Sequence, residues 1–140
     1  MNKLIAKIEK VVNGSKVSFI ASVDEDGFPN MKAMLAPRKR KGLKTFWFST
    51  NTPSRRVEQF RSNSKSSMYF YNKGRFNYQG VMLRGTMEVL EDDDSKKLIW
   101  QFGDTLYYKK GVTDPDYCVL KFTVQDGRYY SNFKSEDFEV

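Results

Sequence analysis

Residues 46–56 read FWFSTNTPSRR, and this stretch decides most of what the sequence says about the fold. Three aromatic residues give way to small hydroxyl and amide residues, as at the end of a largely buried strand. Thr52 followed by Pro53 is typical of a helix start, with Thr52 as the N-cap and Pro53 as the first helical residue. The stretch therefore predicts a strand at 44–50 that leads into a short helix at 53–62.

Two arginines, Arg55 and Arg56, fall in the first turn of that helix. The helix dipole makes this end positive, so each cation costs on the order of a few tenths of a kcal/mol unless something compensates it. A phosphate would reverse this effect, because it would meet free backbone N–H groups, both guanidinium groups and the hydroxyls of Ser49, Thr50 and Ser54. The alternative is a solvated helix start with ordinary surface arginines, which composition by itself favours.

Lys32 is a third cation that the pattern directs toward the same place. The segment 28–36 alternates as a strand, with Lys32 on the face opposite to Met31, Ala33 and Leu35. If this strand is a neighbour of the strand before the arginines, Lys32 joins the anion site. Taken alone, it is equally a solvent-facing lysine on a strand.

The rest of the chain predicts a mostly β fold with peripheral helices. Helical spacing of apolar residues indicates a helix at 2–13, and acidic residues open a second candidate at 91–103. Alternating patterns predict further strands at 17–23, 66–72 and 78–90, and a final hairpin of 118–124 and 129–133 around a QDGR turn. Short connections favour antiparallel neighbours. We expect one domain over residues 1–140, a small antiparallel barrel of six or seven strands with about three helices.

Composition narrows the classes of function. The net charge of +7 favours anionic partners, and the absence of histidine excludes Ser-His-Asp and Cys-His catalysis and makes a metal site improbable. The single cysteine, Cys118, rules out an intrachain disulfide and suits a reducing cytoplasm. No apolar run approaches the roughly 20 residues of a membrane span, and the charged, amphipathic start is unlike a signal peptide.

The order of these motifs resembles a known family. GFPNMKAML, a basic turn, FWFSTNTPSRRVEQF, SSMYFY and YQGVMLRGTMEVLED follow one another as in the pyridoxamine 5′-phosphate oxidase-like flavin-binding split barrels. The resemblance is strongest to the short branch of general-stress and nitroimidazole-resistance-type flavoproteins, and it covers roughly residues 5–130. It implies a split β-barrel that binds flavin mononucleotide (FMN) at the interface of a homodimer.

The resemblance also implies roles for individual residues. Arg55 and Arg56 would hold the FMN phosphate, and Lys32 would reach the phosphate or the ribityl chain. Ser49, Thr50 and Ser54 would donate hydrogen bonds. The remaining cofactor-binding positions are the backbone of Ala33, Met34 and Leu35 at the isoalloxazine edge, and Gln79 from the second subunit. The C-terminal SNFKSEDFEV lacks the arginine and histidine that hold substrate in true pyridoxamine phosphate oxidases, which argues against vitamin B6 oxidation.

The motifs, the charge and the resemblance are compatible with three functions. The first is an FMN-dependent oxidoreductase that moves electrons between small molecules, with no residue assigned as general acid or base. The second is a non-catalytic protein that stores FMN or senses redox state. The third is a nucleic-acid-binding barrel that uses RKRKG (38–42) and exposed aromatics; a solvated hairpin turn explains RKRKG more simply.

Overall fold

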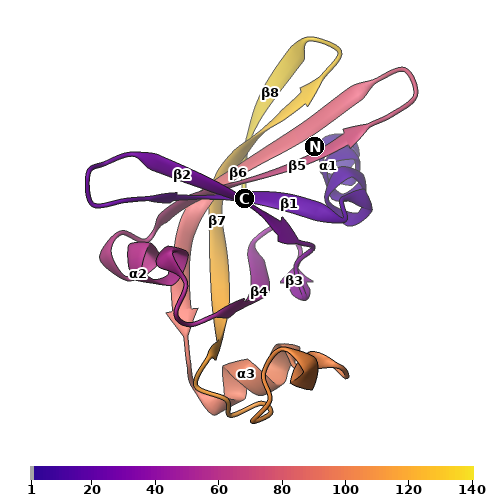
Figure 1. The fold of residues 1–140 in the computed structure, drawn as a ribbon. Helices are drawn as coiled ribbons and strands as arrows, with labels where there is room; N and C mark the ends of the chain where they lie inside the picture. Colours follow the sequence, from indigo (N-terminus) through magenta and orange to yellow (C-terminus); the bar gives the residue numbers. More distant parts are fainter. Residues whose placement is uncertain (1) are drawn as a thin grey trace.

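The fold is one antiparallel sheet that curves around a core, flanked by three α-helices. The computed structural model describes residues 2–140 (Figure 1). Its strands follow the order β2-β1-β5-β6-β7-β4-β3, and β8 pairs with β7 beyond this path. The strands are β1 (Val17–Val23), β2 (Pro29–Leu35), β3 (Lys39–Lys41), β4 (Thr45–Asn51), β5 (Lys65–Lys73), β6 (Tyr78–Leu90), β7 (Tyr117–Ser131) and β8 (Lys134–Glu139).

The predicted fold class is confirmed, with two differences in detail. The described residues form eight strands, and the sheet stays open between its edges at β2 and β3. The additional strand β3 comes from RKRKG, predicted as a turn. Its residues 39–41 pair with Thr45–Trp47, so only Gly42 and its neighbours turn the chain.

The helices follow the predicted order, and their bounds differ. α1 (Asn2–Gly14) agrees with the prediction and packs Ile8, Val11 and Val12 into the core. The other two α-helices are shorter: α2 (Arg55–Ser62) and α3 (Asp93–Ile99). α3 ends at Ile99 because Trp100 adopts an extended backbone. A separate 3₁₀ turn, η1 (Asp104–Leu106), follows Gly103, whose φ is 96°.

The predicted C-terminal hairpin is wrong in position. QDGR lies inside one continuous strand, β7, and the chain reverses later at Asn132 and Phe133, both with positive φ. Asp126 forms a bidentate ion pair with Arg84 of β6, at 2.7 and 2.8 Å, which keeps this part of β7 paired with β6 instead of turning. Gly127 lies so close to the backbone of Met82 and to the Phe138 ring that a side chain would not fit. The glycine therefore serves close strand packing.

The two faces of the first strands are the reverse of what hydrophobicity suggests. In β1 the small residues Ser18 and Ser22 are buried with Ile20, whereas Val17, Phe19, Ala21 and Val23 lie on the other side. In β2, Met31 and Leu35 are 71% and 78% exposed. Among residues 2–140, no helix is long and apolar enough to cross a membrane.

Candidate anion-binding site

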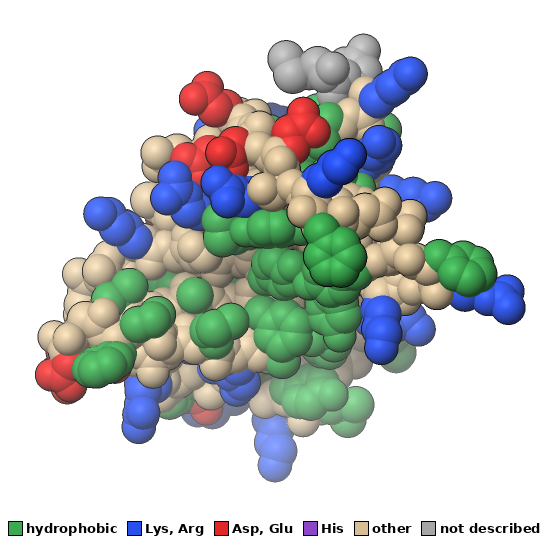
Figure 2. Space-filling view, turned by 90° about the horizontal axis from the view of Figure 1, so that it is seen from above, with side chains coloured by type: hydrophobic (Ala, Val, Ile, Leu, Met, Phe, Trp, Pro, Cys, Tyr) green, Lys and Arg blue, Asp and Glu red, His purple; other side chains and the backbone are tan. Residues whose placement is uncertain are grey.

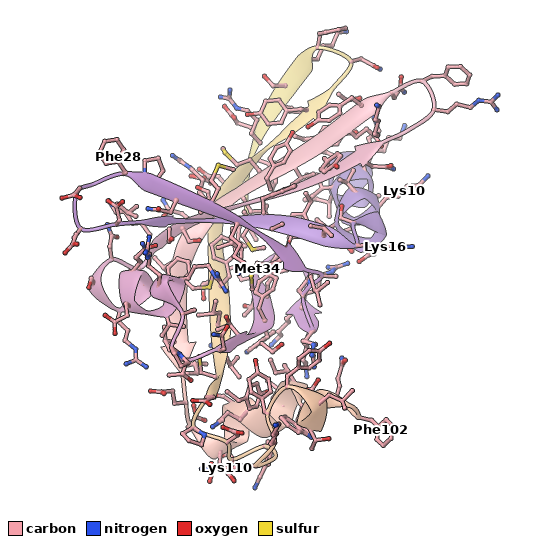
Figure 3. The ribbon with its side chains drawn as sticks, in the orientation of Figure 1. Lys10, Lys16, Phe28, Met34, Phe102 and Lys110 are labelled. Atoms are coloured by element: carbon pink, nitrogen blue, oxygen red, sulfur yellow. The ribbon has the colours of Figure 1, made fainter. Side chains whose placement is uncertain are left out.

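A cavity of about 250 Å³ lies where β2 ends beside β4 and α2. Seven of the ten predicted cofactor-binding residues line it: Lys32, Ala33, Met34, Leu35, Ser49, Thr50 and Arg56. Its other lining residues are Ala36, Arg38, Phe48, Asn51 and Tyr108. β2 and β4 are not paired in the sheet, yet residues of both line this cavity, so Lys32 lies on the same cavity as the end of β4. Figure 3 places Met34 at the centre of the molecule, between β2 and the elements below it.

β4 contributes both hydroxyl residues of the cavity. Successive side chains of a strand point to opposite faces, so Thr50 is buried on the core side while Ser49 is half-buried on the other. β3 pairs only with Thr45–Trp47, which leaves the second half of β4 without a strand partner on the edge toward β2. The cavity lies beside this unpaired edge, and Phe48, Ser49, Thr50 and Asn51 of β4 line it.

Arg56 is the half-buried cation of the cavity that has no acidic partner among residues 2–140. Its Nη2 donates a hydrogen bond to Thr50 Oγ1 at 3.2 Å, and its Nε is buried with no hydrogen-bond partner. Within residues 2–140 no carboxylate lies within ion-pair distance of it, and burial lowers the pKa of its guanidinium. A half-buried charge without a counter-charge is costly, so this site favours an anion.

Arg55 is not part of this cavity. It is exposed and lines a separate hollow of about 670 Å³ together with Asp24, Glu25 and Asp26 of the β1–β2 turn and Glu58. Successive residues of a helix point about 100° apart, so one arginine turns toward the cavity and the next toward the acidic turn. The larger hollow is lined by carboxylates, which disfavour an anion. The predicted pair of phosphate-holding arginines is thus separated.

Ser54 caps α2, and this corrects the predicted helix start. Its hydroxyl accepts a hydrogen bond from the Val57 N–H at 3.3 Å, with Arg55 and Arg56 as the first two helical residues. Thr52 instead donates its backbone N–H to the Asp116 carbonyl at 2.8 Å, which holds the chain outside the helix. The Ser54 hydroxyl is thus engaged in capping and does not line the cavity.

Gln79 also lies outside the cavity. Its Nε2 donates to the Tyr129 hydroxyl at 2.9 Å, and it pairs with Asn72 and Ser131 near the far end of the long hairpins. Nothing within this chain brings Gln79 to the cavity. Its predicted role required a second subunit, and that role stays a prediction.

Two residues that line the cavity, Arg38 and Tyr108, were not among the predicted site residues. Arg38 belongs to the basic segment RKRKG, and nothing in the sequence pattern distinguishes it from the three other cations there. Its guanidinium donates to both carboxylate oxygens of Asp104, at 2.8 and 2.9 Å. Tyr108 lies in an irregular segment between α3 and β7 that carries no periodic pattern, and only the three-dimensional fold brings it to the cavity.

An apolar surface adjoins the cavity. We call it the open face: Val17, Phe19, Ala21, Met31, Ala33, Leu35, Tyr69 and Tyr71, which neighbour one another across β2, β1 and β5. Phe19 and Tyr71 stack with their ring centroids 6.2 Å apart. Figure 2 shows hydrophobic side chains gathered over the middle of the face seen from above, with charged groups around them. Ala33 and Leu35 belong to both the open face and the cavity lining.

Comparisons with known proteins identify the family of this chain. The family model described as "Pyridoxamine 5′-phosphate oxidase" matches residues 4–131. The chain belongs to the pyridoxamine 5′-phosphate oxidase family. The match includes β1 through β7 and therefore every residue that lines the cavity.

Relatives within and around this family differ in length. The pyridoxine/pyridoxamine 5′-phosphate oxidase of Agrobacterium fabrum is 30% identical over 86 residues, 60% of this chain and 39% of that protein. The chain therefore spans about two fifths of that relative's length.

Solved structures extend the likeness over the whole chain. A Clostridium acetobutylicum protein, described as related to general stress protein 26 of B. subtilis, is 40% identical, with a TM-score of 0.88 over 100% of this chain and 96% of that one. General stress protein 26 of Bacillus anthracis is 16% identical, with a TM-score of 0.75 over 98% of each chain, a likeness that shows the fold alone.

Proposed function

We propose that this protein binds FMN in the cavity beside Arg56 and acts as an FMN-dependent oxidoreductase of the pyridoxamine 5′-phosphate oxidase family. The observation that carries the proposal is the half-buried Arg56 guanidinium, which has no carboxylate partner among residues 2–140 and whose Nε is buried without a hydrogen bond. A phosphate supplies the missing charge and the missing acceptor.

The donor set of the cavity fits the two ends of FMN. Arg56, Thr50 and Ser49 offer hydrogen-bond donors to the phosphate, and Lys32 adds an exposed cation at the rim. Met34, Leu35 and Phe48 offer apolar contacts suited to an aromatic ring system. The flavin supplies the electron-transfer chemistry when bound, and this chain supplies binding, orientation and electrostatics. The cations that line the cavity stabilise negative charge on the ligand. The apolar side chains that line it shield one side of the ligand from water.

A homodimer completes the proposed site. About 250 Å³ lies below the roughly 300–1,000 Å³ of typical ligand sites, so a single chain encloses only part of a ligand of this size. The open face borders the cavity, and an apolar face of this kind marks an interaction surface. A second copy packed on the open face would cover the exposed Met31 and Leu35 and would add a wall to the cavity.

A protein that only stores FMN or senses redox state would need the same binding geometry. Catalysis is tested by anaerobic mixing of the FMN-loaded protein with NADH or NADPH, followed by a nitroaromatic acceptor. We expect bleaching of the flavin absorbance by the nicotinamide and its return with the acceptor. A flavin that stays oxidised with both nicotinamides would contradict the proposed nicotinamide-driven activity and would favour storage.

A further inference from the structure

The two guanidinium groups that line the cavity are in opposite states. Arg56 has no acidic partner among the described residues, whereas Arg38 is paired with Asp104 through both of its terminal nitrogens. Arg38 donates to both oxygens of Asp104 and, from Nη1, to the Ile99 carbonyl at 3.2 Å. The Asp104 side chain is only 6% exposed. Arg38 therefore contributes little free charge to a ligand, and its contact with Asp104 serves another purpose.

Asp104 organises the segment that follows α3. Its carboxylate also accepts the Gln101 N–H at 2.8 Å, and its carbonyl accepts the N–H groups of Tyr107 and Tyr108 at 3.0 and 2.9 Å. One residue thus joins the strand side of the cavity, through Arg38, to the turn that carries Tyr108. In Figure 1 this segment lies with α3 below β3 and β4.

Tyr108 is held as a rigid part of the cavity wall. Its ring packs on Tyr117 with centroids 4.9 Å apart and on Trp100 at 6.4 Å. The hydroxyl of Tyr117 is used, since it donates to the Lys96 carbonyl at 2.8 Å. The Tyr108 hydroxyl forms no hydrogen bond with the rest of residues 2–140, and burial raises the pKa of this phenol, so it stays protonated as a donor.

We propose that the Tyr108 hydroxyl donates a hydrogen bond to the ligand in the cavity, and that the Arg38–Asp104 ion pair is the positioning pair that holds Tyr108 there. This inference rests on the proposed function and adds a ligand contact from the segment after α3. It assigns the free donor to Tyr108 and a fixed, ligand-independent role to Arg38.

The test is an FMN fluorescence-quenching titration of the wild-type protein and of four variants. Tyr108→Phe keeps the ring packing and removes the donor, and we expect FMN affinity to fall about fivefold. Tyr107→Phe, its exposed neighbour, is the matched control and should bind like wild type. Asp104→Asn should also weaken binding. In the double variant Asp104→Asn/Tyr108→Phe, FMN affinity should be no lower than in Asp104→Asn alone, because both changes act through one contact.

The outcomes separate this inference from the proposed function. Wild-type protein that binds FMN, with Tyr108→Phe binding equally well, would overturn the inference and leave the proposed function standing. Wild-type protein that does not bind FMN would overturn both. Additive effects of Asp104→Asn and Tyr108→Phe would overturn the positioning role of the ion pair. If Asp104→Asn does not fold, Tyr108→Phe against Tyr107→Phe still decides the ligand contact.

Discussion

At the scale of single residues, the proposed phosphate site depends on the difference between Arg55 and Arg56. The two arginines are adjacent in sequence, and only Arg56 faces the cavity, while Arg55 lies by the acidic turn. Arg56→Ala should weaken FMN binding about 10- to 100-fold, because it removes charge-assisted hydrogen bonds to the phosphate. Arg55→Ala is the matched control and should change affinity less than about threefold. FMN titrations of both variants measure this, and equal losses would contradict the assignment.

The same contrast predicts an effect on stability without ligand. The guanidinium of Arg56 is half-buried without a counter-charge, so Arg56→Ala should not lower the free energy of unfolding of the ligand-free protein. Urea unfolding of wild type and variant without FMN measures this. A loss of more than about 1 kcal/mol would mean that Arg56 has a structural partner that outweighs its burial cost.

Asp104 makes the stability depend on pH in a defined window. Hydrogen bonds from Arg38 hold the pKa of this carboxyl below its usual range. Because its pKa is lower in the folded state, its contribution is complete above the unfolded pKa of about 4 and is lost as the pH falls through the folded pKa. Asp104→Asn should cost about 3 kcal/mol near neutral pH. Urea unfolding from pH 7 to 3 should show this difference shrinking only below about pH 4; a constant difference would contradict it.

At the scale of elements, the long pair β6–β7 depends on close packing of Gly85 beside a bulge, where Gln125 of β7 is left unpaired. The register shifts between Arg84 and Gly85, and a Cβ on Gly85 would overlap the Thr123 carbonyl oxygen. Gly85→Ala should therefore destabilise the fold by about 2 kcal/mol or more. Gly14→Ala is the control, since a Cβ there meets open space, and it should change stability by a few tenths of a kcal/mol at most. Urea unfolding distinguishes the two.

Elements with strong local patterns were predictable from the sequence, and those fixed by distant contacts were not. α1, β1 and β6 agree closely with their predicted ranges, because apolar periodicity decides them. QDGR carries a turn signal, yet Arg84 and Phe138 from neighbouring strands keep it extended. The helix start moved from Thr52 to Ser54 because Thr52 bonds to Asp116, far away in the sequence. Such partners are invisible to a local pattern.

The cavity residues that come from β2 and from the end of β4 could be named from the sequence. Lys32 to Leu35 line the same cavity as Ser49 and Thr50, although β2 and β4 are not paired in the sheet. The pairing of the Arg38 and Tyr108 segments could not be found in this way, since Tyr108 lies 70 positions after Arg38 and only the fold brings the two together. Arg55 was misplaced because adjacency in sequence is not adjacency on a helix face.

At the scale of the whole molecule, the proposed dimer and the proposed ligand site share one surface. Met31→Glu places a charge on the open face outside the cavity lining, and in a twofold interface the charge appears twice. It should weaken dimerisation about tenfold or more and lower FMN affinity with it. Phe102→Glu is the control, because Phe102 projects from the opposite end of the molecule (Figure 3). Sedimentation velocity with and without FMN measures both; a Met31→Glu dimer as stable as wild type would contradict this interface.

FMN binding through the phosphate at Arg56 is tested most simply by the visible absorbance spectrum of the wild-type protein. The protein is incubated with FMN and desalted, beside a riboflavin sample treated identically. We expect flavin bands that stay with the protein after FMN and are largely lost after riboflavin, because the phosphate contacts Arg56. No retained flavin from FMN, or equal retention of both, would contradict it.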